Sequence, residues 1–258
     1  MKSISILGCG WLGFPVAQHL QKSGWEVKGS SRNESRLLDL DKANIKPFNI
    51  DLENLENLDS SFFNSDVLLL NIPPRNGQIS HLEMLNELKQ HVSKGKMKWV
   101  LYVSSTGIYP NLKREVTESD ASSSATSRGG VILKAAEEVW SKENSFTHTV
   151  IRFAGLYGPK REPARFFKGK ENIPGGLNPV NMIHLDDCIG AIEAILAKEL
   201  QNEVFNICSP DHPTRIDFYS SEAKKAQLEP PGFQQDQTEW KIVDPSKFIS
   251  QSGYTFKH

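Results

Sequence analysis

The stretch Gly8-Cys9-Gly10-Trp11-Leu12-Gly13 stands where a short apolar run, residues 3–7, meets a helix-like segment, residues 11–23. Glycine at its first position permits a tight turn, at its third a close approach of a pyrophosphate, and at its sixth close packing of helix on strand. The helix N-terminus offers free N–H groups and a partial positive charge. We therefore expect a dinucleotide to bind Gly8, Gly10, Trp11, Leu12 and Gly13, with a merely tight turn as the alternative.

Strand-like and helix-like segments alternate around this loop through the first 155 residues. The run 66–72 is almost continuously apolar, as in a strand buried on both faces. Such alternation predicts parallel strands joined by crossover helices, and so an α/β fold with a doubly wound parallel sheet. The expected strands are 3–7, 25–30, 45–50, 66–72, 99–103, 147–153 and 204–207, and the expected helices are 11–23, 34–40, 79–92, 131–140 and 187–196.

The regular pattern loosens after residue 155, where residues 156–180 are rich in glycine, proline and cations. We expect a dinucleotide-binding domain over residues 1–155, to which 181–208 return. The remainder of 156–258 is expected to form mainly a small C-terminal substrate-binding cap. Ligands of open α/β sheets bind in the crevice at the carboxyl ends of the strands, which predicts a small-molecule substrate there.

The end of the second strand decides which form of a nicotinamide cofactor fits. An acidic residue there would accept hydrogen bonds from the adenosine ribose, but the stretch reads Gly29-Ser30-Ser31-Arg32-Asn33. A guanidinium beside hydroxyl groups suits a 2′-phosphate through charge-assisted hydrogen bonds. We therefore expect NADP bound through Ser31 and Arg32. NAD with a solvated Arg32 is the alternative.

Further motifs follow in a fixed order: Val103 to Tyr109 after a strand, Lys134 on a helix, Arg152 to Pro159, and Asn181 to Asp187. Together with the glycine loop, this series resembles the NAD-dependent epimerase/dehydratase family, in the extended and atypical part of the short-chain dehydrogenase/reductase superfamily. The resemblance covers about residues 3–256. It implies a Rossmann-like cofactor domain and an NAD(P)-dependent oxidoreductase or epimerase in which a Ser/Thr, Tyr and Lys set moves a proton and nicotinamide moves a hydride.

The resemblance also implies individual site residues. Ser105 matches the family's Ser/Thr, and Lys134 matches its Lys, which contacts the nicotinamide ribose. Asp51 resembles an adenine-contacting Asp, and Asn71 and Pro73 stand where the family lays the cofactor over backbone. The structural alternatives are a strand-end cap at Ser105, a solvated Lys134 and a rigid turn at Pro73.

One position departs from the family. Its Tyr lies four residues before its Lys, and here that position is Gly130. A phenol with an ordinary pKa of about 10 is tuned by a neighbouring ammonium for proton transfer, and glycine has no group to tune. Thr106-Gly107 likewise replaces the Asp-Glu pair of the dehydratase members. Tyr109 is a candidate replacement proton donor, and a structural role is its alternative.

Two charged clusters bear on the substrate and on metals. Residues 160–170 hold five cations against the single acid Glu162, which would attract an anionic substrate unless it is a solvated face. His184, Asp186 and Asp187 stand close together in sequence, but an Asp at a helix start usually accepts backbone N–H groups. We therefore expect Asp186 to be an N-cap and expect no metal.

Composition argues against a nucleic-acid-binding, membrane-spanning or disulfide-rich protein. The 30 Lys and Arg against 31 Asp and Glu give a formal net charge of -1, so nucleic acid is not expected as a partner. No apolar run reaches the roughly 18–20 residues of a membrane span, and the first residues lack a signal pattern, which predicts a cytoplasmic protein. Cys9, Cys188 and Cys208 lack metal or disulfide spacing and are expected to be reduced thiols.

Two functions therefore remain open. One is an NAD(P)-dependent oxidoreductase or epimerase of a small, sugar-derived or anionic substrate with a rearranged proton donor. The other is a catalytically silent NADP-binding sensor or regulatory protein. Lys134 favours the first and Gly130 the second. The sequence is compatible with a monomer or a homodimer.

Overall fold

A five-residue run in which the last four side chains are all buried forms the strand from which the sheet grows. The computed structural model describes residues 2–55, 58–73, 80–121 and 128–258. Strand β1, Ser3–Leu7, pairs in parallel with β2, Glu26–Ser31, on one side and with β4, Val67–Leu70, on the other. Every residue of β4 is buried, as expected for a strand that helices cover on both faces.

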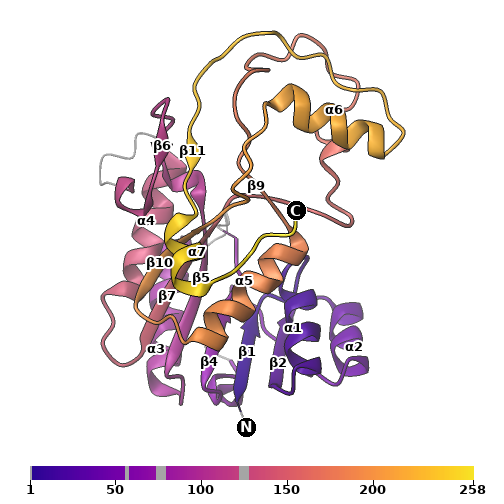
Figure 1. The fold of residues 1–258 in the computed structure, drawn as a ribbon. Coiled ribbons are helices and arrows are strands. Elements are labelled where there is room, and N and C mark those ends of the chain that lie inside the picture. Colours follow the sequence, from indigo (N-terminus) through magenta and orange to yellow (C-terminus); the bar gives the residue numbers. More distant parts are fainter. Residues whose placement is uncertain (1, 56–57, 74–79, 122–127) are drawn as a thin grey trace. The chain divides into compact units, whose positions relative to one another are not determined.

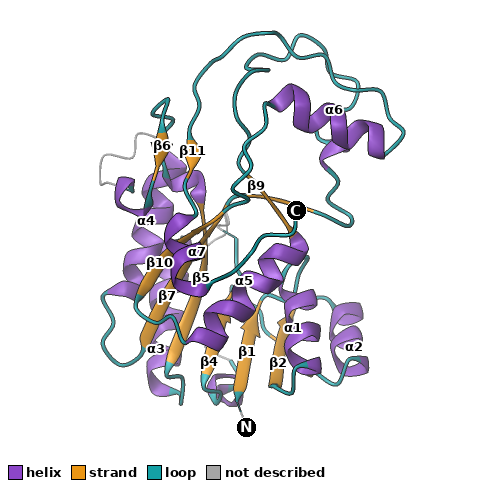
Figure 2. Cartoon of the chain, in the orientation of Figure 1, coloured by secondary structure: helices purple, strands orange, loops and turns teal. Residues whose placement is uncertain are grey.

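The sheet has seven strands in the order β10-β7-β5-β4-β1-β2-β3. The chain thus starts between β4 and β2, so the strand order reverses at β1, and a doubly wound sheet opens its ligand crevice at such a reversal. Figure 2 shows the strands side by side with helices flanking the sheet. The expected α/β parallel fold is confirmed. The other strands are β3, Lys46–Asn49, β5, Trp99–Ser105, β7, Thr147–Phe153, and β10, Glu203–Ile207.

Local sequence signals mark the ends of several helices. Helix α1, Gly13–Lys22, is followed by Gly24, whose positive φ of 84° suits a chain leaving a helix. Helix α3, His81–Lys94, begins with a capping box in which Ser80 and Glu83 satisfy each other's backbone amides. The remaining helices in Figure 1 are α2, Glu34–Lys42, α4, Arg128–Ser141, α5, Leu185–Lys198, α6, Arg215–Lys225, and α7, Ser246–Ser252.

A hydrophobic core joins the sheet to α3 and α4. Leu68 and Leu70 of β4 belong to one buried cluster with Leu85 and Leu88 of α3 and Trp140 of α4. Full burial of each such side chain contributes about 1.5–3 kcal/mol to stability. This packing holds α3 and α4 against the sheet and so fixes the positions of the strand ends.

The chain forms two compact units. The first comprises residues 1–104, 131–151 and 192–204, and the second comprises 105–130, 152–191 and 205–258. Along the sequence, the chain passes between the two units several times, whereas we expected a single main division at residue 155. The segment after β5, residues 105–130, groups with the later part of the chain. Likewise only 192–204 of the expected returning segment, 181–208, group with the first unit.

The second unit contains short elements that the sequence pattern did not predict. Strand β6, Glu115–Val116, pairs with β11, Ile242–Val243, and β8, Gly155–Tyr157, pairs with β9, Met182–His184. Helices α6 and α7 were not expected either. Short 3-10 turns occur in this unit at Thr106–Ile108, Glu118–Asp120 and Pro163–Arg165, and another lies in the first unit at Ser60–Phe63.

Two expectations about the whole chain can be compared with the described residues. None of their helices has both the length and the apolar character that crossing a bilayer requires. Cys9, Cys188 and Cys208 are buried free thiols, as expected.

Candidate functional site

Close packing leaves no room for a side chain at two of the three glycines of the loop, Gly8 and Gly13. Gly8 has φ of 101°, and a Cβ there would collide with the carbonyl oxygen of Asn71. A Cβ on Gly13 would collide with the carbonyl oxygen of Gly8. The Asn71 side chain donates from Nδ2 to that same oxygen over 3.0 Å. Gly8, Gly13 and Asn71 therefore lock the end of β4 against the start of α1.

Gly10 has no such reason to be glycine. It is exposed, its φ is not positive, and a Cβ there would meet no heavy atom within 4 Å. The backbone amides of Gly10, Leu12 and Gly13 have no acceptor among the described residues. Amides left free at the start of a helix bind anions, and the open side of Gly10 lets one approach the backbone. The loop therefore fits the pyrophosphate of a dinucleotide.

Ser30 supports the loop and was not singled out from the sequence. Its Oγ accepts the Gly8 amide at 3.0 Å, and its carbonyl accepts the Cys9 amide at 2.9 Å. Burial raises the pKa of the Cys9 thiol to about 12, so this side chain acts as an apolar filler. A small hydroxyl residue at the end of a buried strand was the available signal for Ser30.

The end of β2 presents the residues expected to select the cofactor. The Ser31 Oγ accepts the Asn33 amide at 3.0 Å, and Asn33 caps α2. Arg32 is half exposed and lies 3.3 Å from an Asp51 carboxylate oxygen and 4.0 Å from Glu53. The structure thus brings Arg32 and Asp51 together, so an anion at Arg32 would compete with carboxylates. A second guanidinium, Arg36, lies over the Phe14 ring at 4.2 Å.

The end of β5 carries two serines with different environments. Ser105, the expected catalytic residue, is partly buried, and its Oγ accepts the Gly107 amide at 3.1 Å. Ser104 is buried, and its Oγ donates to Glu137 Oε1 at 2.6 Å. Glu137 lies on α4 three residues after Lys134, so this bond fixes the helix that carries Lys134. Ser105 belongs to the second unit and Lys134 to the first.

Gly130 lies in the first turn of α4 and is buried. Four residues separate it from Lys134, which puts both on one face of the helix. Lys134 is partly buried. The pKa of Glu138 is lowered mainly by its hydrogen bond with Lys142, and Lys134 adds a smaller electrostatic influence. This face of the helix therefore carries the Lys134 ammonium, and Gly130 adds no side chain that could act as acid or base.

Tyr109, the candidate replacement donor, is enclosed in a polar network. Its side chain is buried, its hydroxyl donates to Asn206 Oδ1 at 2.6 Å, and it accepts from Arg152 at 2.6 Å. Arg152 also donates to the Glu118 carbonyl at 3.0 Å, and the Glu118 carboxylate accepts the Asn206 amide at 2.8 Å. This geometry is that of a structural residue, and it gives the expected proton-donor role of Tyr109 no support.

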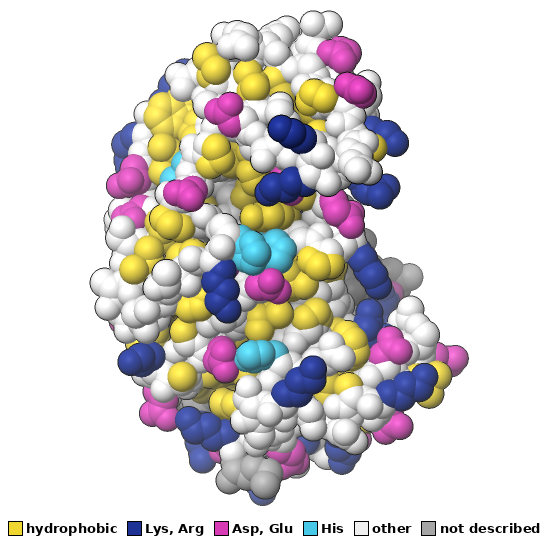
Figure 3. Space-filling model, turned by 45° about the vertical axis from the view of Figure 1, so that its right-hand side comes forward, with side chains coloured by type: hydrophobic (Ala, Val, Ile, Leu, Met, Phe, Trp, Pro, Cys, Tyr) yellow, Lys and Arg dark blue, Asp and Glu magenta, His cyan; other side chains and the backbone are white. Residues whose placement is uncertain are grey.

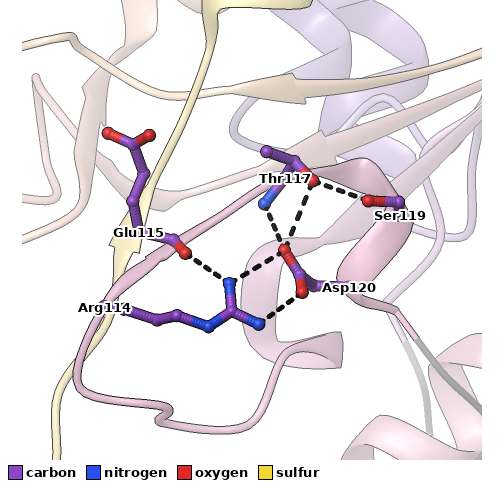
Figure 4. A network of polar contacts seen from close by, with 5 residues as sticks. All are labelled: Arg114, Glu115, Thr117, Ser119 and Asp120. Carbon is purple, nitrogen blue, oxygen red and sulfur yellow. Dashed lines mark hydrogen bonds and ion pairs between the residues drawn. The ribbon is translucent and has the colours of Figure 1, made fainter.

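A second network orders the segment around Glu118, as Figure 4 shows. Arg114 donates to an Asp120 carboxylate oxygen over 2.7 Å, and Asp120 accepts the Thr117 amide over 2.8 Å. The hydrogen bonds from Arg114 and Thr117 hold the pKa of Asp120 down at about 2. The turn that presents Glu118 to Asn206 is therefore held by a charge-assisted clamp.

The prediction that Asp186 caps α5 was wrong. The helix starts at Leu185, so Asp186 is its second residue, and the position before the helix belongs to His184. The Nδ1 atom of His184 accepts the Asp186 amide at 3.2 Å and performs the capping. An imidazole nitrogen replaced the carboxylate because the helix begins one residue earlier than its acidic residues suggest.

The cations of residues 160–170 are mostly exposed. Arg165 lies 3.6 Å from Glu162, and Lys168 and Lys170 are exposed. On the face drawn in Figure 3, basic and acidic side chains are interspersed. The segment therefore offers local positive charge within a mixed surface.

Comparison with known proteins places this geometry in a family. Residues 8–182 match the family model described as NAD(P)H-binding. The chain is 32% identical over 268 aligned positions to "Protein YeeZ" of Escherichia coli K12, an alignment that covers 100% of this chain and 97% of that protein. The chain belongs to the NAD(P)H-binding family.

Solved structures show the same fold at lower identity. A functionally unknown conserved protein from Silicibacter pomeroyi DSS has a TM-score of 0.83 at 22% identity, with 100% of this chain and 94% of that chain covered. UDP-glucuronic acid 4-epimerase from Bacillus cereus, in complex with NAD, has a TM-score of 0.78 at 20% identity, with 99% and 94% covered. These likenesses confirm the expected Rossmann-like α/β fold.

Proposed function

We propose that this protein is an NADP-linked oxidoreductase or epimerase that acts on a small, sugar-derived or anionic molecule. The proposal rests on one observation: neither packing nor backbone conformation requires a glycine at position 10. Close approach of a ligand to the backbone is the remaining reason for it, and the free amides of Gly10, Leu12 and Gly13 supply the matching donors.

Each proposed contact uses a group with suitable chemistry. The loop amides bind the pyrophosphate, and the half-exposed Arg32 guanidinium with Ser31 binds the 2′-phosphate in place of Asp51. Lys134 donates to the nicotinamide ribose, Asp51 and the backbone near Asn71 and Pro73 border the adenosine, and Ser105 donates to a substrate oxygen. When bound, the nicotinamide would supply or accept the hydride.

The proton must then move without a phenol at position 130. Ser105 is partly exposed, and its hydroxyl proton is free to donate because its Oγ acts as acceptor toward Gly107. We place the substrate oxygen at this hydroxyl. The exposed cations Lys168 and Lys170 favour an anionic substituent on the substrate.

Cofactor titration with a glycine pair tests the proposal. Gly10→Ala places a methyl group where the pyrophosphate would lie but meets no protein atom, so it should fold normally and lose at least tenfold in NADPH affinity. Gly129 is also exposed with open space around it, so Gly129→Ala is the matched control and should bind as the parent does. Quenching of protein fluorescence by NADPH and NADH measures both. Equal NADPH affinity in Gly10→Ala would overturn the proposal.

A silent NADP sensor is the second candidate, and two observations favour it. Gly130 has no acid or base, and the Tyr109 hydroxyl is already engaged by Arg152 and Asn206. Incubation of NADPH with a panel of carbonyl compounds, followed by nicotinamide absorbance, separates the two functions. Turnover that Lys134→Ala abolishes supports the enzyme. Tight NADPH binding without turnover of any compound supports the sensor.

A further inference from the structure

Three potential metal ligands meet at the start of α5, apart from the glycine loop. One Asp186 carboxylate oxygen lies 3.5 Å from His184 Nδ1 and 3.4 Å from His258 Nε2. The two imidazole rings lie 4.0 Å apart between centroids, and the three ligand atoms all lie within 4.8 Å of one another. Figure 3 shows adjoining histidine side chains beside an acidic one on this face of the molecule. All three residues belong to the second unit.

We propose that His184, Asp186 and His258 form a binding site for a divalent transition metal ion, with zinc as the best fit. Two imidazoles and one carboxylate are a donor set that zinc takes. Ligand atoms at zinc–ligand distances of about 2.0–2.2 Å in a tetrahedron lie about 3.3–3.6 Å from one another. Both measured oxygen–nitrogen separations fall in that range. Closing the site requires that the two nitrogens approach each other and that His184 Nδ1 releases the Asp186 amide.

His258 is held in place by the neighbouring carboxylate. Asp187 is fully buried and accepts the Tyr254 hydroxyl at 2.9 Å, the Lys257 amide at 2.9 Å and the His258 amide at 3.1 Å. Glycine at position 190 lets the Tyr254 ring lie close to α5, because a Cβ on Gly190 would collide with that ring. The backbone of residues 254–258 is thus anchored on α5 without a metal, and the His258 imidazole is delivered to Asp186.

His184 is suited to metal binding. Its side chain is 15% exposed, and the Tyr157 ring packs edge-on against it at 5.1 Å between centroids. Burial and the neighbouring His258 lower the pKa of His184, which favours the neutral imidazole that binds metals. The Nδ1 lone pair now accepts a hydrogen bond from the Asp186 amide over 3.2 Å. A metal bound to Nδ1 would use this lone pair, and the Asp186 amide would then donate to water instead.

Three protein ligands leave one tetrahedral position for water. The ion would cross-link residues 254–258 to the beginning of α5, adding to the Asp187 clamp. A metal that binds the folded chain better than the unfolded one raises its stability by mass action.

Metal titration of the chain without a histidine tag tests the site. Protein stripped with a chelator is titrated with Co²⁺, whose visible absorption reports tetrahedral coordination by nitrogen and oxygen, and then with Zn²⁺ in competition. We expect one ion per chain, and at least a tenfold loss of affinity in His184→Ala, Asp186→Asn and His258→Ala. Because the Asp187 clamp uses the backbone amide of residue 258, His258→Ala should fold as the parent does.

The control removes a histidine that also faces a carboxylate. His19 lies 2.9 Å from Glu193 with no third ligand near enough to complete a set among the described residues. His19→Ala should therefore keep the full metal affinity, and Zn²⁺ should raise the unfolding temperature of the parent and of His19→Ala but not of His258→Ala. Absence of stoichiometric binding, or metal affinity equal to the parent's in all three site variants, overturns the proposal.

Discussion

The Arg32 guanidinium, just after β2, is the group for which the proposed 2′-phosphate would compete with two carboxylates that follow β3. Arg32 lies 3.3 Å from Asp51 and 4.0 Å from Glu53, and all three side chains are about half exposed. Exposed ion pairs are worth about 0.2–1 kcal/mol, which a doubly charged phosphate can replace. If NADP binds as proposed, Asp51 should therefore weaken the preference for NADP without abolishing it.

A substitution at Asp51 tests this competition. Asp51→Asn removes the charge that holds Arg32, so the ratio of NADPH to NADH affinity should rise by about two- to fivefold, as expected for one exposed pair. The ratio is the right measurement because any adenine contact made by Asp51 serves both cofactors equally. Arg32→Ala should lower the same ratio. An unchanged ratio in both variants would show that the 2′-phosphate lies elsewhere.

Helix α4 and strand β5 are joined by one buried polar contact. The Ser104 hydroxyl donates to the Glu137 carboxylate over 2.6 Å, and both residues are nearly inaccessible to solvent. A buried carboxylate depends on its donors, because desolvation disfavours the charge. The contact also places Lys134, one turn earlier on the same helix.

Ser104→Ala should therefore lower stability without removing a site residue. Loss of a donor to a buried acid costs about 1–3 kcal/mol in free energy of unfolding, measured by urea denaturation. Ser145→Ala is the comparison, because Ser145 is exposed, and it should change this free energy by less than about 0.5 kcal/mol. Equal stability of the two variants would mean that Glu137 does not depend on Ser104.

The segment after β5 is linked to β7 and β10 through Tyr109. Tyr109→Phe removes the hydroxyl between Arg152 and Asn206 and leaves both groups short of a partner in a buried place. We expect the free energy of unfolding to fall by about 1–3 kcal/mol while NADPH affinity stays unchanged. A variant with parental stability but no turnover would instead identify Tyr109 as a proton donor.

Across the whole molecule, the sequence predicted best where the signal was local. The strands β1, β4, β5 and β7 and the helices between them follow from apolar runs and periodicity, and the glycine loop follows from its strand–turn–helix context. The two-residue strands β6 and β11 pair across more than 120 positions, which no local pattern reveals. Helix α6 carried a readable signal, since the Thr214 side chain caps it and accepts the Asp217 amide.

The candidate site divides in the same way. Gly8, Gly10 and Gly13 could be assigned from spacing, because each glycine has a separate reason that spacing encodes. The contact of Arg32 with Asp51 and the enclosure of Tyr109 by Arg152 and Asn206 depend on side chains that only folding brings together. His258 joins His184 for the same reason.

Buried histidines should make the stability of the whole chain sensitive to mild acid. Burial lowers the pKa of His81, His148 and His184 below the ordinary value of 6.5, and neither ring nitrogen of His81 has a hydrogen-bond partner among the described residues. Below about pH 6.5 the unfolded chain binds protons that the folded chain does not, so unfolding becomes easier as the pH falls toward the folded-state pKa. Carboxylates with lowered pKa values, such as Asp120 with a pKa of about 2, change the free energy of unfolding only at lower pH.

The free energy of unfolding should therefore be smaller at pH 5.5 than at pH 7.5, and urea denaturation at both values measures the difference. His81→Gln keeps a polar side chain of similar size but cannot take up the proton, so it should reduce that difference. His148→Gln should reduce it as well, and the two effects should add, because a group contributes only through its own change in proton binding. A stability that is flat between these pH values, or equal slopes in parent and variants, would show that these imidazoles become protonated in the folded chain without resistance from burial.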